Sequence, residues 1–507
     1  MSVETKRVNL NIPVAHFRDV LSWDKSTIDR LVSAAVEVAQ RVGLRLDDDT
    51  EGIYLKEAES KGAKIDWNLR AALFTESDIH ETIAAMRKTL PAPSPLRERA
   101  ISVDGRDERF MVGNGGNLLF DLDAWQAKAP TAADIVEICL WAEGCDDVAG
   151  LFSPVIPKDV DQRLSPIYTY ALIAKYCRKK VYHEQPTEPM HVRYLEKMAR
   201  VVEKHVGYFQ PMQEWEYVNP PFRLGFRSVA TMLERVDTGA CNVMGIGAMS
   251  VAGMSAPVTV AGIAVTALAE ILAALTLLRI LRPGCGLRGN SCTGTLDLRT
   301  ARVSYFDMHG FLGNLATWEL LTRGIGADAP CLTWYRDTNE PGMQALYEFG
   351  MAQAFFSSVL QKCAPEIGGL ACGNTFSPHQ AMLDMEIIKE FNELAHGFEV
   401  SEQALGVEEI INARFQQGVH MSTEHTIAYM KDGVPFSSFL YRGLPAGAQH
   451  DKHHDQSTEL MEKAAQAVET AKTKGRQAEP DVRLAEELYE YVKAAANELG
   501  IEAPPLP

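Results

Sequence analysis

The sequence predicts an α/β protein, a (β/α)8 TIM barrel with N-terminal and C-terminal helical additions. Eight short apolar runs suited to strands begin between residues 147 and 367. They cover 220 residues in seven intervals, or about 31 residues each, which is the spacing of repeated βα units. Most intervals also contain apolar residues at helical spacing. An open doubly wound sheet is the alternative, because periodicity does not show whether a sheet closes.

The predicted strands share a short apolar run, and they span 147–152, 180–184, 212–218, 241–247, 284–290, 302–308, 331–337 and 367–373. The predicted helices share a 3.6-residue apolar period, and they span 165–178, 189–205, 223–237, 257–281, 310–323, 341–362 and 378–394. Several of these helices begin with Pro, which suits the first helical turn. The interval 291–301 has no helical pattern and is predicted to be a loop.

Three segments follow from this pattern. Residues 1–145 are predicted to form a mostly helical extension packed on the barrel, with helices at 28–42 and 78–90 and possible capping residues at 75–77. Residues 146–445 are predicted to form the barrel. Residues 446–507 are predicted to form a C-terminal helical segment, with charged helices around 460–468 and 482–499.

Composition excludes several classes of protein. The 507 residues are 46% apolar and 23% charged, which is ordinary for a globular protein. The net charge of −17 repels a phosphate backbone and an anionic membrane, so neither nucleic acid nor a membrane is an expected partner. The nine cysteines are odd in number and mostly lie in apolar runs, which favours reduced thiols. The first twenty residues contain no apolar core of a secretory signal, so we expect a cytoplasmic protein.

One apolar segment resembles a membrane span. Between residues 240 and 278 the only charged residue is Glu270, and residues 257–281 are long enough to cross a bilayer. No second segment of this kind exists, so a buried helix of the barrel is the preferred interpretation. The stretch 240–281 also offers apolar surface for a partner subunit, in line with an expected homo-oligomer.

The glycine and histidine motifs carry little chemistry. Gly284 to Gly289 match the letters G-x-G-x-x-G, but they follow a predicted helix and no helix opens after them, so a dinucleotide site is not expected. The polar run from His450 to Asp455 could bind a metal, although a solvated loop is the preferred interpretation. No C-x-x-C spacing occurs, and no metal site is predicted.

Polar and aromatic residues gather at the carboxyl ends of the predicted strands, where barrel active sites lie. They include His183, Glu184, Glu214, Trp215, Glu216, Tyr217, Arg288, Asn290, Tyr305, Asp307, His309, Trp334, Tyr335, Arg336, Asp337, Cys372 and Asn374. Aromatic rings and carboxylates together suit a quaternary ammonium group, which has no N–H to donate. Packing is the alternative for any single aromatic residue, because alternate strand residues face away from the lumen.

From this group we predict specific roles. The substrate-binding residues are Trp215, Arg288, Tyr305, Trp334, Tyr335, Asp337 and Asn374. Glu214, Asp307 and His309 are the candidate catalytic residues, because each can act as a general acid if the leaving group needs a proton. Glu214 and Asp337 would also supply negative charge, and Arg288 or His309 would hold a substrate carboxylate.

Residues 249–284, which contain the run A-P-V-T-V-A-G, resemble the trimethylamine methyltransferase family. Similar landmarks are V-N-P-P at 218–221, L-D-L-R-T-A at 296–301, the run at 337–348, M-L-D-M-E-I-I at 382–388 and E-H-T at 424–426. The resemblance covers roughly residues 25–445. It implies a TIM barrel that moves a methyl group from a methylated amine to the cobalt of a separate corrinoid protein.

The resemblance also implies a substrate class. The trimethylamine enzymes of the family use pyrrolysine, whereas the comparable region here holds ordinary residues at 334–336. The chain therefore resembles members without pyrrolysine, which are associated with quaternary amines such as glycine betaine. Residues 307–310 depart from the Pro-Glu-Gly-like element that relatives often carry, so a different donor is the alternative.

The expected reaction needs no tightly bound cofactor, because cob(I)alamin is carried by the partner protein. A quaternary ammonium releases a neutral amine, so the enzyme must mainly position the donor and exclude water. A tertiary amine, a methoxy compound or a methylated sulfur compound is the alternative donor. A non-catalytic small-molecule-binding barrel and a flavin or nicotinamide oxidoreductase remain as alternative classes.

Overall fold

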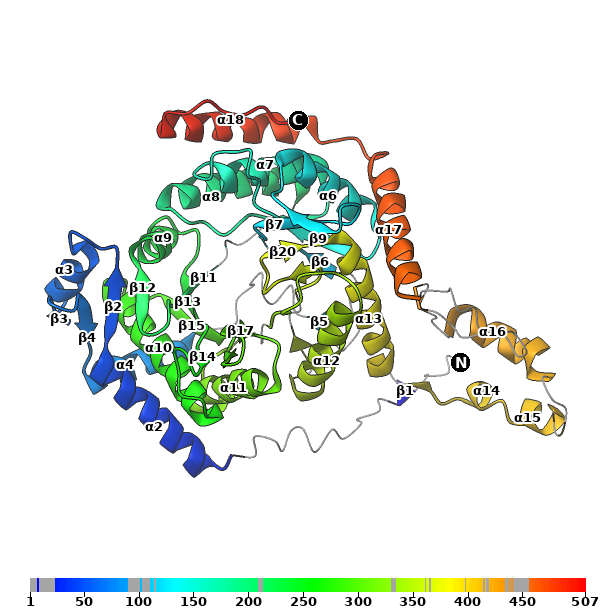
Figure 1. The fold of residues 1–507 in the computed structure, drawn as a ribbon, viewed down its shortest axis with the longest axis horizontal. Helices are drawn as coiled ribbons and strands as arrows, with labels where there is room; N and C mark the ends of the chain where they lie inside the picture. Colours follow the sequence, from blue (N-terminus) through cyan, green and yellow to red (C-terminus); the bar gives the residue numbers. More distant parts are fainter. Residues whose placement is uncertain are drawn as a thin grey trace.

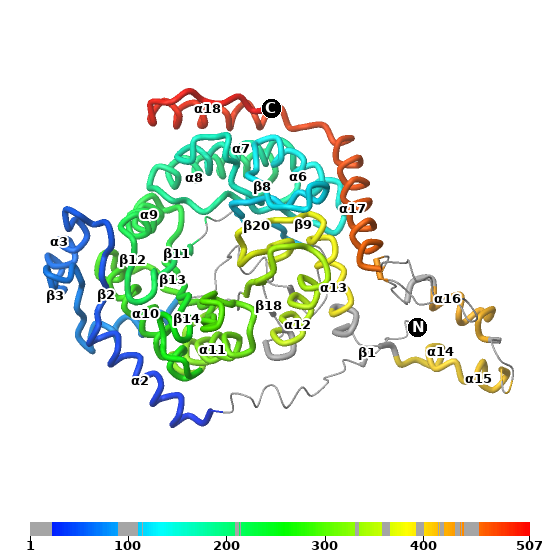
Figure 2. The backbone as a smooth tube through the Cα atoms, in the orientation of Figure 1, coloured from blue at the N-terminus to red at the C-terminus, as the bar shows by residue number. Residues whose placement is uncertain are grey.

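The computed structural model describes residues 7–8, 23–89, 101–102, 110–113, 115–207, 212, 214–329, 334–360, 362–363, 366–396, 398–413, 415, 419–433, 437, 439–440 and 456–507. Helices surround a central group of short strands, and the first and last helices lie outside this ring (Figure 1). The backbone tube follows the same path, with the C-terminal helices along one side of the molecule (Figure 2). The fold is a mixed α/β structure.

The strands are mostly short. They are β1 (Arg7–Val8), β2 (Leu44–Asp47), β3 (Lys64–Asp66), β4 (Ala71–Leu73), β5 (Ile101–Ser102), β6 (Phe110–Val112), β7 (Leu118–Asp121), β8 (Gln126–Lys128), β9 (Val148–Phe152), β10 (Lys180–Tyr182), β11 (Trp215–Tyr217), β12 (Arg223–Gly225), β13 (Val243–Ala248), β14 (Val251–Ala252), β15 (Gly286–Ser291), β16 (Gly294–Asp297), β17 (Arg302–Ser304), β18 (Lys362–Cys363), β19 (Gly369–Leu370), β20 (Thr375–Phe376) and β21 (Phe398–Glu399).

The helices are longer and cover the strands. They are α2 (Lys25–Val42), α3 (Ile53–Ser60), α4 (Glu76–Lys88), α6 (Ala132–Gly144), α7 (Ser165–Tyr176), α8 (Pro189–Val206), α9 (Phe226–Asp237), α10 (Val260–Leu281), α11 (Met308–Glu319), the π-helical turn η2 (Leu320–Gly324), α12 (Met343–Leu360), α13 (Pro378–His396), α14 (Glu402–Leu405), α15 (Val407–Ala413), the 3-10 turn η3 (Val419–Ser422), α16 (Glu424–Gly433), α17 (Gln456–Gly475) and α18 (Val482–Leu499).

Parallel pairing joins strands that are separated by helices. β9 lies between β6 and β10, and β13 lies between β11 and β15, all in parallel register. β7 and β20 also pair in parallel. The first five predicted barrel strands correspond to β9, β10, β11, β13 and β15, and every predicted helix from 165 to 394 is present. β6 and β7 precede residue 146, yet they pair with strands that follow it, and the division into three segments stays a prediction.

The barrel itself is not confirmed, because the described strands form several small sheets and no closed one. The predicted strand 302–308 corresponds to β17, which pairs antiparallel with β16. The interval 291–301 was predicted to be a loop and instead contains β16, so that prediction was wrong. Residues 331–333 of the seventh predicted strand lie outside the described residues, and 334–338 form no strand.

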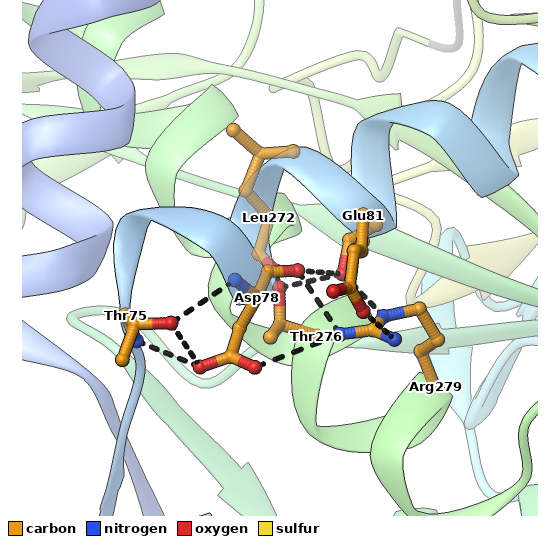
Figure 3. Close-up of polar contacts among 7 residues, drawn as sticks. Thr75, Asp78, Glu81, Leu272, Thr276 and Arg279 are labelled. Atoms are coloured by element: carbon orange, nitrogen blue, oxygen red, sulfur yellow. Dashed lines mark hydrogen bonds and ion pairs between the residues drawn. The ribbon is translucent and has the colours of Figure 1, made fainter.

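The N-terminal region is fixed to α10 by a polar cluster at the start of α4 (Figure 3). Thr75 accepts a hydrogen bond from the backbone N–H of Asp78 (3.2 Å), and the Asp78 carboxylate accepts one from the Thr75 N–H (2.8 Å). This capping box satisfies two donors at the helix end. Arg279 of α10 then donates to the Asp78 carbonyl (3.1 Å) and forms an ion pair with Glu81 (2.8 Å).

The apolar segment suspected of crossing a membrane is the buried helix α10. It has a mean hydropathy of 2.1, and 78% of its most apolar window lies inside the protein. It contacts α2, α4, α11 and β13. The Glu270 carboxylate accepts hydrogen bonds from the Ser250 hydroxyl (2.7 Å) and from the Phe222 N–H (3.0 Å). The expectation of a buried helix is confirmed. In the same apolar stretch, Met254 and Val258 are 69% and 61% exposed, so the expected surface for a second subunit stays a prediction.

Two glycines allow α17 to pack closely on α6. A Cβ at Gly144 would lie 1.9 Å from the Ala471 carbonyl oxygen, and one at Gly475 would lie 1.9 Å from that of Leu140. The helix backbones therefore approach each other at these positions, where only glycine fits. This contact fixes the C-terminal segment to the ring of helices.

Candidate functional site

A cavity of about 540 Å³ opens at the carboxyl ends of β9, β10 and β11. β9 ends at Phe152, β10 is followed by His183 and Glu184, and β11 ends at Glu216 and Tyr217. Helix α9 contributes Arg227, Ser228 and Thr231 to the lining of the cavity, which also includes Tyr335 and Glu366. The volume is that of a small-molecule site, and strand ends are where α/β proteins bind ligands.

Glu184 is a buried carboxyl group in the cavity wall. Its Oε2 accepts a hydrogen bond from Ser165 Oγ at 3.2 Å, at the first turn of α7. Burial raises the pKa of Glu184 to about 7, while the Ser165 hydrogen bond and the charge of Lys158 act in the opposite direction. This carboxyl group therefore changes its charge near neutral pH.

His183 lies beside it and is neutral at the same pH. Its Nδ1 lies 2.7 Å from the Glu184 backbone oxygen. A carbonyl oxygen only accepts, so Nδ1 carries the proton. Burial lowers the pKa of His183 to about 4, with Arg235 adding a smaller effect in the same direction. The imidazole consequently adds no positive charge to the cavity.

Glu216 is the second buried carboxylate of the site. It forms an ion pair with Arg235 of α9 at 2.8 Å, and Gln185 donates a hydrogen bond to it at 3.4 Å. Both charged side chains are almost fully buried. Burial raises the pKa of the Glu216 carboxyl, and the positive charge of Arg235 opposes this effect. Glu216 lines the cavity, whereas Arg235 lies behind it and does not.

The cavity is therefore acidic and aromatic. Its lining includes three carboxyl groups, from Glu184, Glu216 and Glu366, and one side chain with a permanent positive charge, Arg227. Arg227 is largely exposed and lies 3.5 Å from Glu188. The aromatic residues of the lining are Phe152, Tyr217 and Tyr335. Ring faces and carboxylates together favour a cationic ligand.

Of the ten predicted site residues, one lines this cavity. Tyr335 does so, and its ring contacts the predicted residue Tyr305 edge to face, with 6.0 Å between the centroids. Asp337 holds the backbone of this neighbourhood, since its carboxylate accepts a hydrogen bond from the Tyr305 N–H (2.9 Å). Asp337 also lines a separate cavity of about 660 Å³, together with Cys372 and Arg302.

Four other predicted residues are buried and do not line the cavity. Glu214 and Arg288 form an ion pair at 3.2 Å, and Arg288 also lies 3.3 Å from Asp328. Trp215 packs on the backbone of Gly245, and Trp334 packs among aromatic rings of α12. Their predicted roles in catalysis or substrate binding have no support from this placement.

The remaining three predicted residues have structural contacts elsewhere. Asp307 is the N-cap of α11 and accepts hydrogen bonds from the Gly310 N–H (2.8 Å) and the Thr295 hydroxyl (2.8 Å). His309 bonds through Nε2 to the Val258 carbonyl oxygen. Asn374 is exposed and accepts a hydrogen bond from Asn117 at 3.0 Å.

Sequence reasoning named four cavity residues as strand-end groups without giving them a role, namely His183, Glu184, Glu216 and Tyr217. It missed Gln185, Ser228, Arg227 and Glu366 altogether. The available signal was the run from His183 to Gln185 directly after an apolar strand, which is where barrel sites lie. No sequence signal pointed to Glu366, since it precedes its strand.

Metal and disulfide chemistry have no support in the described part of the chain. No group of three or more His, Cys, Asp or Glu side chains there is arranged to hold a metal ion. The cysteines whose side chains are described form no disulfide. The run from His450 to Asp455 lies outside the described residues.

The fold and the cavity define an α/β protein with a small-molecule site at its strand ends. Residues 2–500 match the family described as trimethylamine methyltransferase (MTTB), and the chain belongs to this family. It is 28% identical over 299 residues to trimethylamine methyltransferase MttB1 of Methanosarcina acetivorans, and 20% identical over 411 residues to trimethylamine methyltransferase MttB of Desulfitobacterium hafniense. The first match covers 55% of this chain and 56% of the relative, and the second covers 79% of each.

Proposed function

We propose that this protein is a methyltransferase that moves a methyl group from a quaternary amine, of the betaine type, to the Co(I) of a separate corrinoid protein. Membership of the family supports methyl transfer from a methylated amine, since the relatives are named trimethylamine methyltransferases, and the corrinoid acceptor is part of the proposal. The quaternary amine rests on one observation, the acidic and aromatic lining of the cavity at the ends of β9, β10 and β11.

In this proposal, carboxylates and aromatic rings of the cavity both contribute to binding. Glu216 pairs with Arg235 at 2.8 Å, and Glu184 adds a negative charge when it loses its proton. Tyr217 and Tyr335 present aromatic surface to the methyl groups. Arg227 lies on the same wall, where it can pair with a carboxylate of a betaine. In this proposal Arg227 binds that carboxylate, and not Arg288 or His309 as the sequence predicted.

The cavity is of small-molecule size and suits the methyl donor rather than a macrocycle with its nucleotide tail. The corrinoid therefore belongs to the partner, and when it is present it supplies the nucleophile that takes the methyl group. A quaternary donor leaves as a neutral amine, so this chain has only to orient the donor and exclude water.

A tertiary amine is the second candidate donor, and Glu184 favours it. A tertiary amine that leaves as a secondary amine needs a proton on nitrogen, and a carboxyl group with a pKa of about 7 can hold one. Glu184 takes the role of general acid in this alternative, because Glu214, Asp307 and His309 have contacts away from the cavity.

The test is methylation of the cognate corrinoid protein in its Co(I) state, followed as the appearance of the methyl-Co(III) spectrum. The donor panel contains glycine betaine, other quaternary amines and trimethylamine. Methylation by quaternary amines supports the proposal, and methylation by trimethylamine alone supports the second candidate. If no donor in the panel methylates cobalt, but the protein binds a cation, a non-catalytic binding protein is the better description.

Three further proposals complete this picture. The repeated parallel pairing of strands across helices supports a (β/α)8 barrel. The absence of disulfides among the described cysteines suits a reducing compartment such as the cytoplasm. The homo-oligomer is the third proposal, and the surface that would form it is described next.

A further inference from the structure

A helical arm projects from the ring of helices beyond α13 and α17 (Figure 1). We define it as the described residues 400–413, 415 and 419–433, which include α14, α15, η3 and α16. Its described contacts are largely within the arm: Thr423 bonds Glu409 at 3.0 Å, and His425 stacks on Tyr429 with 4.6 Å between the ring centroids. The arm is therefore a small helical unit on the side of the molecule.

The arm has almost no interior of its own. Among its described residues, only Ala413 is a buried apolar residue. Nine large apolar side chains between residues 400 and 430 are more than two-fifths exposed. Phe415 is fully exposed, Met421 is 83% exposed, and Ile410 and Ile427 are about 60% exposed. A helical segment this short needs apolar burial to stay folded, and the described residues around it do not supply it.

The exposed surface is of the size that a dimer needs. Nine side chains exposed to this degree present on the order of 800 Å² of apolar area, which equals the share of one partner in a standard interface. Monomers rarely expose an apolar patch of more than a few hundred Å². Its content of Met, Phe and Ile is typical of the core of a permanent interface.

The charges of the arm lie mainly at its helix starts. The first turns of α14, α15 and α16 hold acidic residues, where a negative charge stabilises the helix, namely Glu402, Glu408, Glu409 and Glu424. The arm also extends sideways from the ring (Figure 1), so a protein bound to it leaves the strand ends accessible.

We propose that the arm docks on the arm of a second copy of this chain, in a two-fold symmetric dimer. Each exposed apolar residue then occurs twice in the interface, once from each protomer. The proposal concerns assembly and is independent of the methyl donor.

The experiment is sedimentation equilibrium of the full chain at micromolar concentrations. We expect the wild type to have twice the 56.0 kDa mass of the chain. The double variant Ile410→Asp/Ile427→Asp places four charges in the interface and should weaken the dimer at least about a hundredfold, so that it sediments as a monomer. Leu69→Asp is the matched control, because Leu69 is equally exposed but lies in the N-terminal region, and it should remain dimeric.

Far-ultraviolet circular dichroism should be the same for all three proteins, since the substituted side chains are exposed. A second double variant, Phe415→Ser/Met421→Ser, gives an uncharged change on the same surface and should also dissociate. A wild type that is monomeric at these concentrations overturns the proposal. So does a pair of arm variants that both remain dimeric, because the dimer would then use another surface.

Discussion

Glu184 should make the unfolding free energy of this protein depend on pH, and the substitution Glu184→Gln should remove this dependence. Burial raises the pKa of its carboxyl from 4.5 to about 7 in the folded chain. Between these two values the folded state holds a proton that the unfolded state has lost. The contribution of Glu184 to stability is therefore fully present below pH 4.5 and is lost as pH rises through 7.

The size of the effect follows from the same two values. The difference between 4.5 and about 7 corresponds to about 3 kcal/mol of unfolding free energy. Glu184→Gln keeps the shape of the protonated carboxyl and an oxygen that can accept from Ser165, but it cannot ionise. We expect this variant to be close to the wild type at pH 5 and more stable by up to about 3 kcal/mol at pH 8.

Urea unfolding of both proteins from pH 5 to pH 9 measures this difference, and the titration of all other groups largely cancels in it. Glu37→Gln, on the exposed side of α2, is the control and should show a small difference at every pH. Binding of tetramethylammonium is the second measurement. It should tighten in the wild type as pH rises through 7, and should change little in the variant. A stability difference that is the same at pH 5 and pH 8 would refute the reasoning.

The remaining predictions concern packing and the choice between two carboxylates. Glu216→Gln should cost about 3 to 5 kcal/mol by urea unfolding and should weaken tetramethylammonium binding, because it lines the cavity and neutralises a buried arginine. Glu214→Gln should cost less and leave binding intact, since its arginine retains a second carboxylate; weaker binding would restore its predicted catalytic role. Gly475→Ala should lower the thermal midpoint, because its Cβ would meet the Leu140 carbonyl oxygen at 1.9 Å. Gly350→Ala, in a helix with open space around it, should raise the midpoint slightly.

Most helices were predictable because their apolar residues recur at helical spacing, whereas α3 and α6 were not predicted. The possible cap at 75–77 and the Pro that opens α8 are visible in the sequence, and the structure has Thr75 as the N-cap of α4 and Pro189 at the start of α8. The strand 302–308 was predicted wrongly as a barrel strand, because an apolar run does not reveal its partner. Its partner is β16, a neighbour in the chain that pairs with it antiparallel.

The site was harder to predict. Alternate residues of a strand point to opposite faces, and the sequence does not show which set faces the cavity. Trp215 and Glu216 are adjacent on β11, and only Glu216 lines the cavity. The sequence does not distinguish the two residues, and Trp215 was the one predicted to bind the substrate. Arg288 similarly looked like a ligand for a carboxylate, whereas it lies buried in an ion pair with Glu214. Such pairs form between distant segments and leave no local pattern.

The position of α10 has a consequence for how the chain is made. This helix has 22 residues and is so apolar that its exposure to water would be strongly unfavourable. Its neighbours α2 and α4 leave the ribosome before it, whereas α11 follows it. The N-terminal region therefore serves as a cover that is already present when the most apolar segment emerges. A chain that starts after residue 89 should aggregate or insert into membranes during synthesis, even though its strand-end cavity is intact in sequence.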